Sequence, residues 1–299
     1  MSEESDKTRM LGDIRIDRVL ESEEPEFPIF SFFPDAMVEA LAPHRSWMEP
    51  RFLEPGTDKI IAAVQSYVVR TKHHTILIDT CVGNHKQRRF WPAWNMRESE
   101  RYLKGLADIG VSVEQIDFVM CTHLHTDHVG WNTRLMNGQW VPTFPNARYI
   151  FAKDEFAFWE ELNKKGAKYS DGCINDSVLP VVAAGQADLV SSDFSLDDNL
   201  WIEPTPGHTP GHISIRLSSC GCDGVLTGDV MHSPIQCTFP DWGVAGDGDK
   251  DLARQTRKKF LDRYAETSTR ILTSHFPSPS AGFIRRAGEA FKFVFDGET

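Results

Sequence analysis

The chain has 299 residues, 40% of them hydrophobic and 25% charged, which is the composition of a folded globular protein. Its formal net charge of −11 argues against a nucleic-acid partner, because proteins that bind nucleic acids usually present a basic face. No apolar run approaches the roughly 18 residues of a membrane span, and the polar first residues do not resemble a secretory signal. The six cysteines form no CxxC pair, so we expect reduced thiols and a cytoplasmic protein without a membrane partner.

The N-terminal part predicts one strand followed by an aromatic segment. Residues 1–10 are expected to be disordered, and the alternation of polar and apolar residues over 13–20 predicts a half-buried strand. Residues 25–56 are rich in proline and aromatic side chains and predict only a short helix, at about 35–41. This segment could pack against a sheet edge or form the wall of a site, and the sequence favours neither reading.

The remaining elements alternate between strands and amphipathic helices. Strands are predicted at 60–69, 75–78, 116–120, 140–143, 148–151, 189–190, 200–202, 213–217, 224–227 and 270–273. Helices are predicted at 97–109, 154–165, 251–266 and 281–295, with 167–180 irregular. No glycine-serine linker divides the chain, so we expect one layered α/β domain over residues 1–299.

Histidine and aspartate side chains gather directly after the strand predicted at 116–120. His123, His125, Asp127 and His128 lie within six positions, in a chain that has only 11 histidines. Neutral imidazole and carboxylate are the ligands that divalent transition metals prefer. The cluster therefore predicts a metal site.

Three later side chains occupy similar positions. His208 stands in a turn rich in proline and glycine at 205–212, which would hold its side chain in place. Asp229 and His275 each follow a predicted strand.

These motifs together resemble the hydrolases of the metallo-β-lactamase superfamily. The resemblance rests on H-x-H-x-D-H at 123–128, G-H-T-P-G-H at 207–212, Gly228-Asp229 and His275, and spans about residues 58–277. It implies an αββα four-layer sandwich with a dinuclear metal site at the edge of its two sheets. By position, one metal would be bound by His123, His125 and His208, the second by Asp127, His128 and His275, with Asp229 bridging them.

The resemblance implies two divalent cations, with zinc expected first and manganese, iron or cobalt left open. Two such cations can share a hydroxide that attacks the substrate. Asp127 could then pass a proton to the leaving group. Asp79 and His212 are expected to orient ligands or to pack beside them rather than to bind metal.

The residue three positions after Asp229 bears on the substrate. In acyl-homoserine-lactone lactonases a tyrosine stands there, whereas this chain has His232. The departure argues against homoserine-lactone specificity, and residues 228–236 are more similar to the branch that contains methyl-parathion hydrolase and related lactone and aryl-ester hydrolases. His232 could donate a hydrogen bond to a developing oxyanion, or it could be a loop histidine with a backbone partner.

Several large aromatic residues are expected near the motifs. A pocket lined by them would suit a neutral aromatic or acyl-bearing ester; the candidates are Trp91, Trp94, Trp131, Phe239 and Trp242.

The sequence thus predicts a metal-dependent hydrolase. Its substrate would be a small molecule, either a lactone or another ester such as an aryl ester. A phosphotriester hydrolase, a thioester hydrolase or a persulfide dioxygenase on the same ligands are the alternatives. A homodimer remains open.

Overall fold

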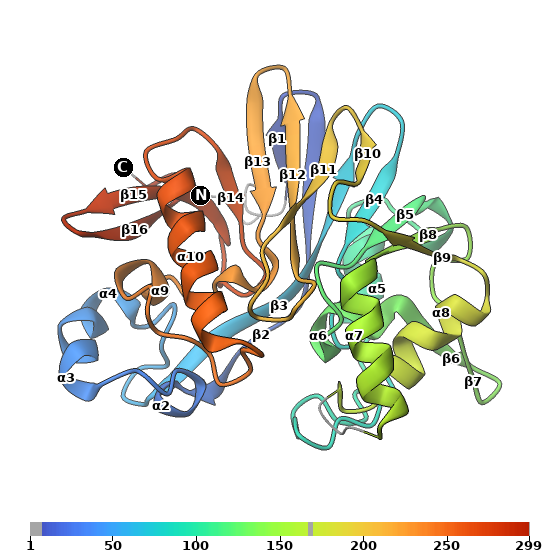
Figure 1. The fold of residues 1–299 in the computed structure, drawn as a ribbon, viewed down its shortest axis with the longest axis horizontal. Helices are drawn as coiled ribbons and strands as arrows, with labels where there is room; N and C mark the ends of the chain where they lie inside the picture. The colour runs from blue at the N-terminus through green and yellow to red at the C-terminus, as the bar shows by residue number, and fades with distance from the viewer. Residues whose placement is uncertain (1–7, 167–169, 299) are drawn as a thin grey trace.

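The computed structural model describes residues 8–166 and 170–298, which form two seven-stranded sheets packed face to face with helices outside them (Figure 1). The first sheet has the strand order β1-β2-β3-β4-β5-β8-β9. Its strands are β1 (Thr8–Leu11), β2 (Ile14–Pro28), β3 (Lys59–Arg70), β4 (Thr75–Ile78), β5 (Phe118–Met120), β8 (Arg148–Ala152) and β9 (Ala187–Val190).

The second sheet follows the chain order from β10 to β16. Its strands are β10 (Ser195–Asp197), β11 (Leu200–Pro204), β12 (Ile213–Ser219), β13 (Cys222–Leu226), β14 (Arg270–Leu272), β15 (Ala281–Ala287) and β16 (Ala290–Phe295). A separate hairpin joins β6 (Thr133–Met136) to β7 (Gln139–Pro142).

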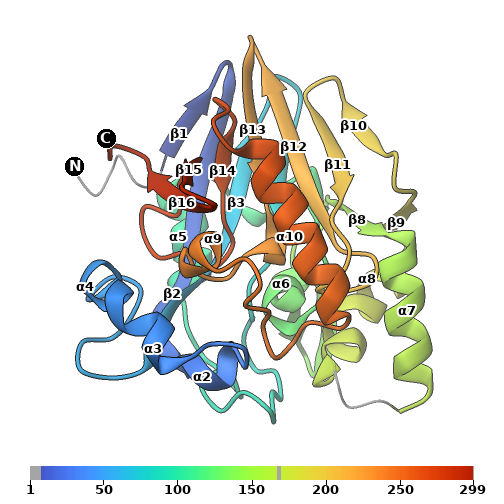
Figure 2. The same ribbon diagram turned by 60° about the vertical axis from the view of Figure 1, so that its left-hand side comes forward.

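The helices form the two outer layers (Figures 1 and 2). Beside the first sheet lie α5 (Arg101–Asp108), α6 (Thr126–Val129), α7 (Lys153–Lys164), a π-helical turn (Ile174–Val178) and α8 (Leu179–Ala183). Beside the second lie α2 (Ile29–Phe32), α3 (Val38–Leu41), α4 (Arg45–Met48), α9 (Ile235–Thr238) and α10 (Lys250–Tyr264). Short 3₁₀ turns occur at Ala42–His44, Val113–Gln115, Gly130–Asn132 and Gly228–Val230. No helix of the described residues is long and apolar enough to cross a bilayer.

Three hydrophobic clusters fill the three interfaces of these four layers. Successive side chains of a strand point to opposite faces, so β3 contributes Val68 to the cluster under α5 and Val69 to the cluster between the sheets. The third cluster joins Ile271 of the second sheet to Phe260 of α10. The αββα sandwich expected from the sequence is therefore present.

The sheet topology brings distant loops to one edge. β4 and β5 run parallel, as do β13 and β14, so the carboxyl ends of each pair lie together. β12 is antiparallel to β13, which places the turn before β12 at the same edge. The loops that carry the histidines and aspartates all begin or end there.

Residues 281–295 are not the helix that the sequence predicted. They form the β15–β16 hairpin, with Ala287 paired to Ala290 and Gly288 at φ 64° in the turn. The alternate residues Phe291, Phe293 and Phe295 share one buried face, which is the period of a strand. The helical reading overlooked this period.

Other expectations at the N-terminus also need correction. Thr8–Leu11 form β1 and pair with β2, so residues 8–10 are ordered, whereas residues 1–7 lie outside the described part of the chain. β2 extends to Pro28, well beyond the predicted strand, with irregular register near its prolines. Three short helices, not one, occupy residues 29–48. The irregular stretch expected at 167–180 contains the π-turn, and 167–169 are not described.

The segment 25–56 packs into the core and also contacts His232. Ile29, Phe33 and Leu53 are fully buried in the cluster of the second sheet. Phe32 instead packs against the ring of His232, with 5.5 Å between ring centroids. One side of the segment is therefore core, and the other borders the candidate site.

Candidate metal centre

The loop after β5 is held rigidly by a buried carboxylate. Asp79, which directly follows β4, accepts hydrogen bonds from the backbone N–H of Thr122 (2.7 Å) and from its hydroxyl (2.9 Å). The chain then enters the single turn of α6, so His123 and His125 precede the helix and Asp127 and His128 lie within it. The ligand-bearing loop thus starts from a fixed point at the sheet edge.

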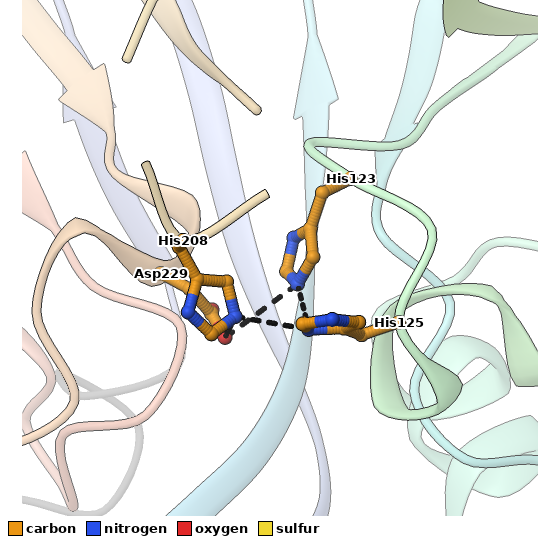
Figure 3. A group of neighbouring side chains, drawn as sticks. All are labelled: His123, His125, His208 and Asp229. Atoms are coloured by element: carbon orange, nitrogen blue, oxygen red, sulfur yellow. Dashed lines mark hydrogen bonds and ion pairs between the residues drawn. The ribbon is translucent and has the colours of Figure 1, made fainter. Parts of the chain in front are cut away.

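The first group of candidate ligands combines this loop with the turn before β12 (Figure 3). Nε2 of His123 lies 3.0 Å from Nδ1 of His125, which lies 2.9 Å from Nε2 of His208. Oδ2 of Asp229 is 3.2 Å from His208 Nε2 and 3.6 Å from His123 Nε2. The donor atoms of these four side chains all lie within 4.8 Å of one another, a spacing that suits a metal ion.

The second group faces the other oxygen of the same aspartate. Oδ1 of Asp229 lies 3.0 Å from Nε2 of His275 and 3.2 Å from Nε2 of His128. Oδ2 of Asp127 is 3.7 Å from both of these nitrogens. Asp229 therefore stands between the two groups and presents one oxygen to each.

The unpartnered polar atoms of the centre fit a cation at the second group. Nε2 of His128, Nε2 of His275 and Oδ1 of Asp229 are buried and have no hydrogen-bond partner of proper geometry in the described structure. Burying such groups without a partner is costly, and buried charges are normally paired or coordinate a metal. The unpartnered atoms converge where the resemblance places the second metal, and the donor atoms of the first group lie close enough together for the other, so the residues fit a dinuclear centre.

The outward nitrogens of three candidate ligand histidines are held by fixed acceptors. His128 Nδ1 lies 2.8 Å from Asp79, His208 Nδ1 lies 2.8 Å from Asp247, and His275 Nδ1 donates to the Ala63 carbonyl at 2.8 Å. Such contacts turn the opposite nitrogen toward the metal and raise ligand basicity.

Asp247 was missed by the sequence analysis. It stands between Gly246 and Gly248 in the loop before α10, where only its glycine flanks give a weak signal of a constrained position.

The electrostatics of the centre also favour cations. Burial lowers the pKa of His123 and His125 well below its usual value. For His208, burial opposes protonation, but Asp229 and Asp247 together raise the pKa to about 9. His128 behaves similarly: its pKa is raised by carboxylates against the effect of burial. The carboxylates thus attract positive charge, which bound metal ions would supply in place of protons.

His212 lies beside the centre and holds the backbone of Asp229. Its Nδ1 is 3.1 Å from the carbonyl of Thr205, and its Nε2 accepts a hydrogen bond from the backbone N–H of Asp229 at 2.9 Å. Gly228 is required here, because a Cβ at this residue would lie 2.5 Å from His212 Nε2 and because its φ is 53°.

His232 is buried against the aspartate shared by the two groups. Its Nε2 is 3.0 Å from Oδ2 of Asp229, and its ring is parallel to that of His275, with centroids 5.2 Å apart. Burial lowers the pKa of His232 to about 4, so its imidazole is neutral near pH 7.

The structure separates the five aromatic residues expected in a pocket. Trp91 and Trp94 line a cleft together with Phe27. Trp131 is buried, stacks on Tyr102 and donates its indole N–H to Glu21 at 2.7 Å. Trp242 is also buried and stacks on Phe239, with ring centroids 4.3 Å apart.

The cleft has a volume of ≈ 740 Å³ and lies between β2 and the loop that precedes α5. Phe27 contacts Trp91 edge to face and stacks on Phe32, which in turn contacts His232. The aromatic wall of the cleft is therefore continuous with the border of the metal centre. Glu24 and Glu26 place carboxylates on the same wall.

Comparisons with known proteins agree with this geometry. The family model of the metallo-beta-lactamase superfamily matches residues 62–275, a range that contains the seven side chains of the first two groups. An N-acyl homoserine lactonase of Bacillus cereus is 24% identical over 220 residues, which are 70% of this chain and 79% of that protein. Among solved structures, AidC, a dizinc quorum-quenching lactonase in complex with a product, is 27% identical with a TM-score of 0.81 and 98% of each chain covered. The hydrolase AbOPH shares the fold at 24% identity, with a TM-score of 0.81 and 97% and 96% of the two chains covered.

Proposed function

The chain belongs to the metallo-beta-lactamase superfamily, and from this we propose that it is a metal-dependent hydrolase that opens lactones. The observation that carries the proposal is the convergence of the two ligand groups on Asp229, with unpartnered nitrogens of His128 and His275 aimed at one of its oxygens. The relatives named as lactonases support a lactone as the first substrate class to test. Aryl esters are the second substrate class to test.

We propose that His123, His125 and His208 hold one cation, that Asp127, His128 and His275 hold the other, and that Asp229 contacts both. When bound, two divalent cations supply Lewis acidity toward a carbonyl oxygen and lower the pKa of a water molecule. Zinc is the cation that we expect, because the dizinc lactonase is among the similar structures.

The chain's own residues then move protons and stabilise charge. Asp127 is the least buried carboxylate of the ligand set, so it can accept a proton from the attacking water and return it to the leaving alkoxide. His232 can place Nε2–H toward an oxygen that gains negative charge beside Asp229, since this nitrogen faces the centre. Asp79, Asp247 and His212 keep the ligands oriented.

The cleft suggests which part of a substrate is held beside the centre. Its aromatic wall of Phe27, Trp91 and Trp94 suits an acyl or aryl arm. The same lining holds the carboxyl groups of Glu24 and Glu26 and the guanidinium groups of Arg97 and Arg101, so its charge does not select the arm. We expect neutral esters to be favoured over β-lactams because the aromatic wall suits an apolar arm.

The test is a comparison of initial rates after zinc loading. The substrates are lactones with and without an N-acyl amide, an aryl carboxylic ester, a phosphotriester, a thioester and a β-lactam. We expect the fastest turnover with a lactone and none with the β-lactam. Asp229→Asn is the control, because it retains the side-chain shape and removes the charge shared by both groups.

A protein that binds zinc but turns over only the phosphotriester would replace the lactone assignment with the organophosphate alternative. Turnover of the thioester alone would favour the thioester branch. If no hydrolysis occurs with zinc, manganese or iron, persulfide oxidation would become the leading candidate.

A further inference from the structure

Glu155 is a buried carboxylate in the first turn of α7, with only 1% of its surface exposed. It is not among the metal-type groups, and its hydrogen-bond partners are neutral N–H groups on three separate segments. A buried carboxylate is expensive to maintain, so its contacts define what it does.

One oxygen of Glu155 holds the first ligand loop. Oε1 accepts the backbone N–H of Leu124 at 3.0 Å, and Leu124 lies between the ligands His123 and His125. The same oxygen accepts the indole N–H of Trp159 at 2.7 Å. The Trp159 ring packs edge-on against His125, with 5.4 Å between ring centroids.

The other oxygen holds the second ligand loop. Oε2 accepts the backbone N–H of Gly211 at 3.0 Å, in the turn that carries His208. The approach is so close that a Cβ on Gly211 would lie 2.3 Å from the backbone nitrogen of Glu155. Glycine is therefore required at this position for α7 to reach the turn.

We infer that Glu155 is a positioning residue that fastens the His123–His125 segment to the His208 turn and so sets the geometry of one metal site. The two loops come from different sheets, and they bring nitrogens of His125 and His208 to 2.9 Å from each other. A single carboxylate that bonds to both backbones fixes this separation.

The effect should be confined to one of the two metals. His128 is fixed by Asp79, and His275 is fixed by the Ala63 carbonyl, so the second site has its own supports. Loss of Glu155 should therefore weaken the ion held by His123, His125 and His208 and spare the other.

Glu21 provides a control for this inference, with one difference: its Oε2 also lies 3.8 Å from the Arg97 guanidinium. It is equally buried, and it too accepts two backbone N–H groups, from Val82 and Gly83, and one indole N–H, from Trp131. The segments that Glu21 holds contain none of the residues proposed to bind the first metal. Glu21→Gln should lower stability in the same way as Glu155→Gln without the selective effect on metal binding.

The experiment is a Zn²⁺ titration of the metal-free full chain against a chromophoric chelator. Wild type is expected to bind two ions. In Glu155→Gln the amide presents an N–H where Gly211 needs an acceptor, so one ion should bind 10- to 100-fold more weakly, roughly the effect of losing an outer-shell partner, and the other should be unchanged. Co²⁺ absorption of the substituted protein gives a second readout, with only one of two site spectra altered.

Gly211→Ala should reproduce the selective loss, because it pushes α7 from the turn. Trp159→Phe is a milder variant that keeps a ring against His125, and it should weaken the same ion by a smaller factor. Unchanged affinity for both ions in these variants, or an equal loss in Glu21→Gln, would overturn the inference. It rests on the metal centre of the proposed function and not on the substrate, so a failure to hydrolyse lactones would leave this result standing.

Discussion

The backbone N–H of Asp229 donates a hydrogen bond to Nε2 of His212, with 2.9 Å between the two nitrogens. Burial lowers the pKa of His212 to about 3, so the imidazole is neutral and keeps the lone pair that this bond requires. His212 thereby fixes the peptide that carries the carboxylate shared by both ligand groups.

Replacing His212 with Leu should leave the Asp229 N–H buried without an acceptor. Such a loss typically costs about 1–3 kcal/mol of unfolding free energy. We also expect roughly 10- to 100-fold lower activity, as for other partners that orient ligands. Urea unfolding and initial rates measure the two effects. His212→Gln can still offer a carbonyl oxygen and should recover part of both; equal losses in the two variants would show that the accepting nitrogen is not what matters.

Asp247 should matter to metal binding through His208, although it also accepts the Val244 N–H and lies 3.6 Å from Arg257. Its Oδ1 lies 2.8 Å from His208 Nδ1, and Asp247→Ala removes that support, so zinc affinity of one site should fall by about 10- to 100-fold. The measurement is zinc competition with a chelator. Asp241→Ala is the control, because Asp241 is an exposed partner of Lys258 and should leave zinc affinity unchanged. A loss of affinity of similar size in both variants would contradict the assignment.

His232→Phe separates a catalytic from a packing role for His232. Phenylalanine keeps a ring that can stack on His275 but lacks the nitrogen that faces Asp229. If this nitrogen stabilises an oxyanion, kcat should fall by about 10²- to 10³-fold with little change in KM or in bound zinc. Unchanged kcat would assign His232 to packing.

That the candidate ligand side chains meet at one edge could be predicted from the sequence, because most of them follow a recognisable buried strand. Strand periodicity placed His123, Asp229 and His275 at strand ends, and parallel pairing of β4 with β5 and of β13 with β14 brings such ends to one edge. The residues that orient the candidate ligands through their outward nitrogens could not be found in this way. Asp247 reaches His208 across 39 positions of sequence, and no local pattern records that contact.

The C-terminal hairpin shows where local patterns conflict. Residues 281–295 contain helix-forming residues, yet the buried Phe291, Phe293 and Phe295 alternate with the exposed Lys292 and the half-buried Val294, and the tertiary environment selects the strand. Trp131 shows the other limit. An aromatic residue next to a motif can belong to the core as easily as to a pocket. The buried indole of Trp131 donates to Glu21, and this contact could not be read from the sequence.

The packing of the β15–β16 hairpin under the candidate metal centre can be tested by mutation. Phe276 directly follows the ligand His275, is fully buried, and packs edge to face on Phe293 with centroids 5.1 Å apart. Phe276→Ala should cost about 3–5 kcal/mol of unfolding free energy. Lys292→Ala, on the exposed face of β16, should change it by less than about 0.5 kcal/mol. Equal effects in urea unfolding would place the hairpin outside the core.

Glu26 should make stability depend on pH in an unusual direction. Burial raises the pKa of this carboxyl from 4.5 to about 7 in the cleft wall, against smaller opposing effects of Trp94 and Arg97. The folded protein therefore holds a proton that the unfolded chain releases between these two values. Its contribution to stability is complete below about pH 4.5 and is lost as the pH rises through about 7.

Glu26→Gln removes this titration and keeps the shape of the side chain. Relative to the variant, wild type should lose unfolding free energy as the pH rises from 5 to about 7, and the difference should level off above that range. Urea unfolding at several pH values, with zinc held in excess, measures the difference. Glu26→Ala should flatten the profile equally while also losing packing. A wild-type profile parallel to that of Glu26→Gln would show that the carboxyl is not protonated in the folded state near neutral pH, and the cleft would then carry its full negative charge at the pH of the rate measurements.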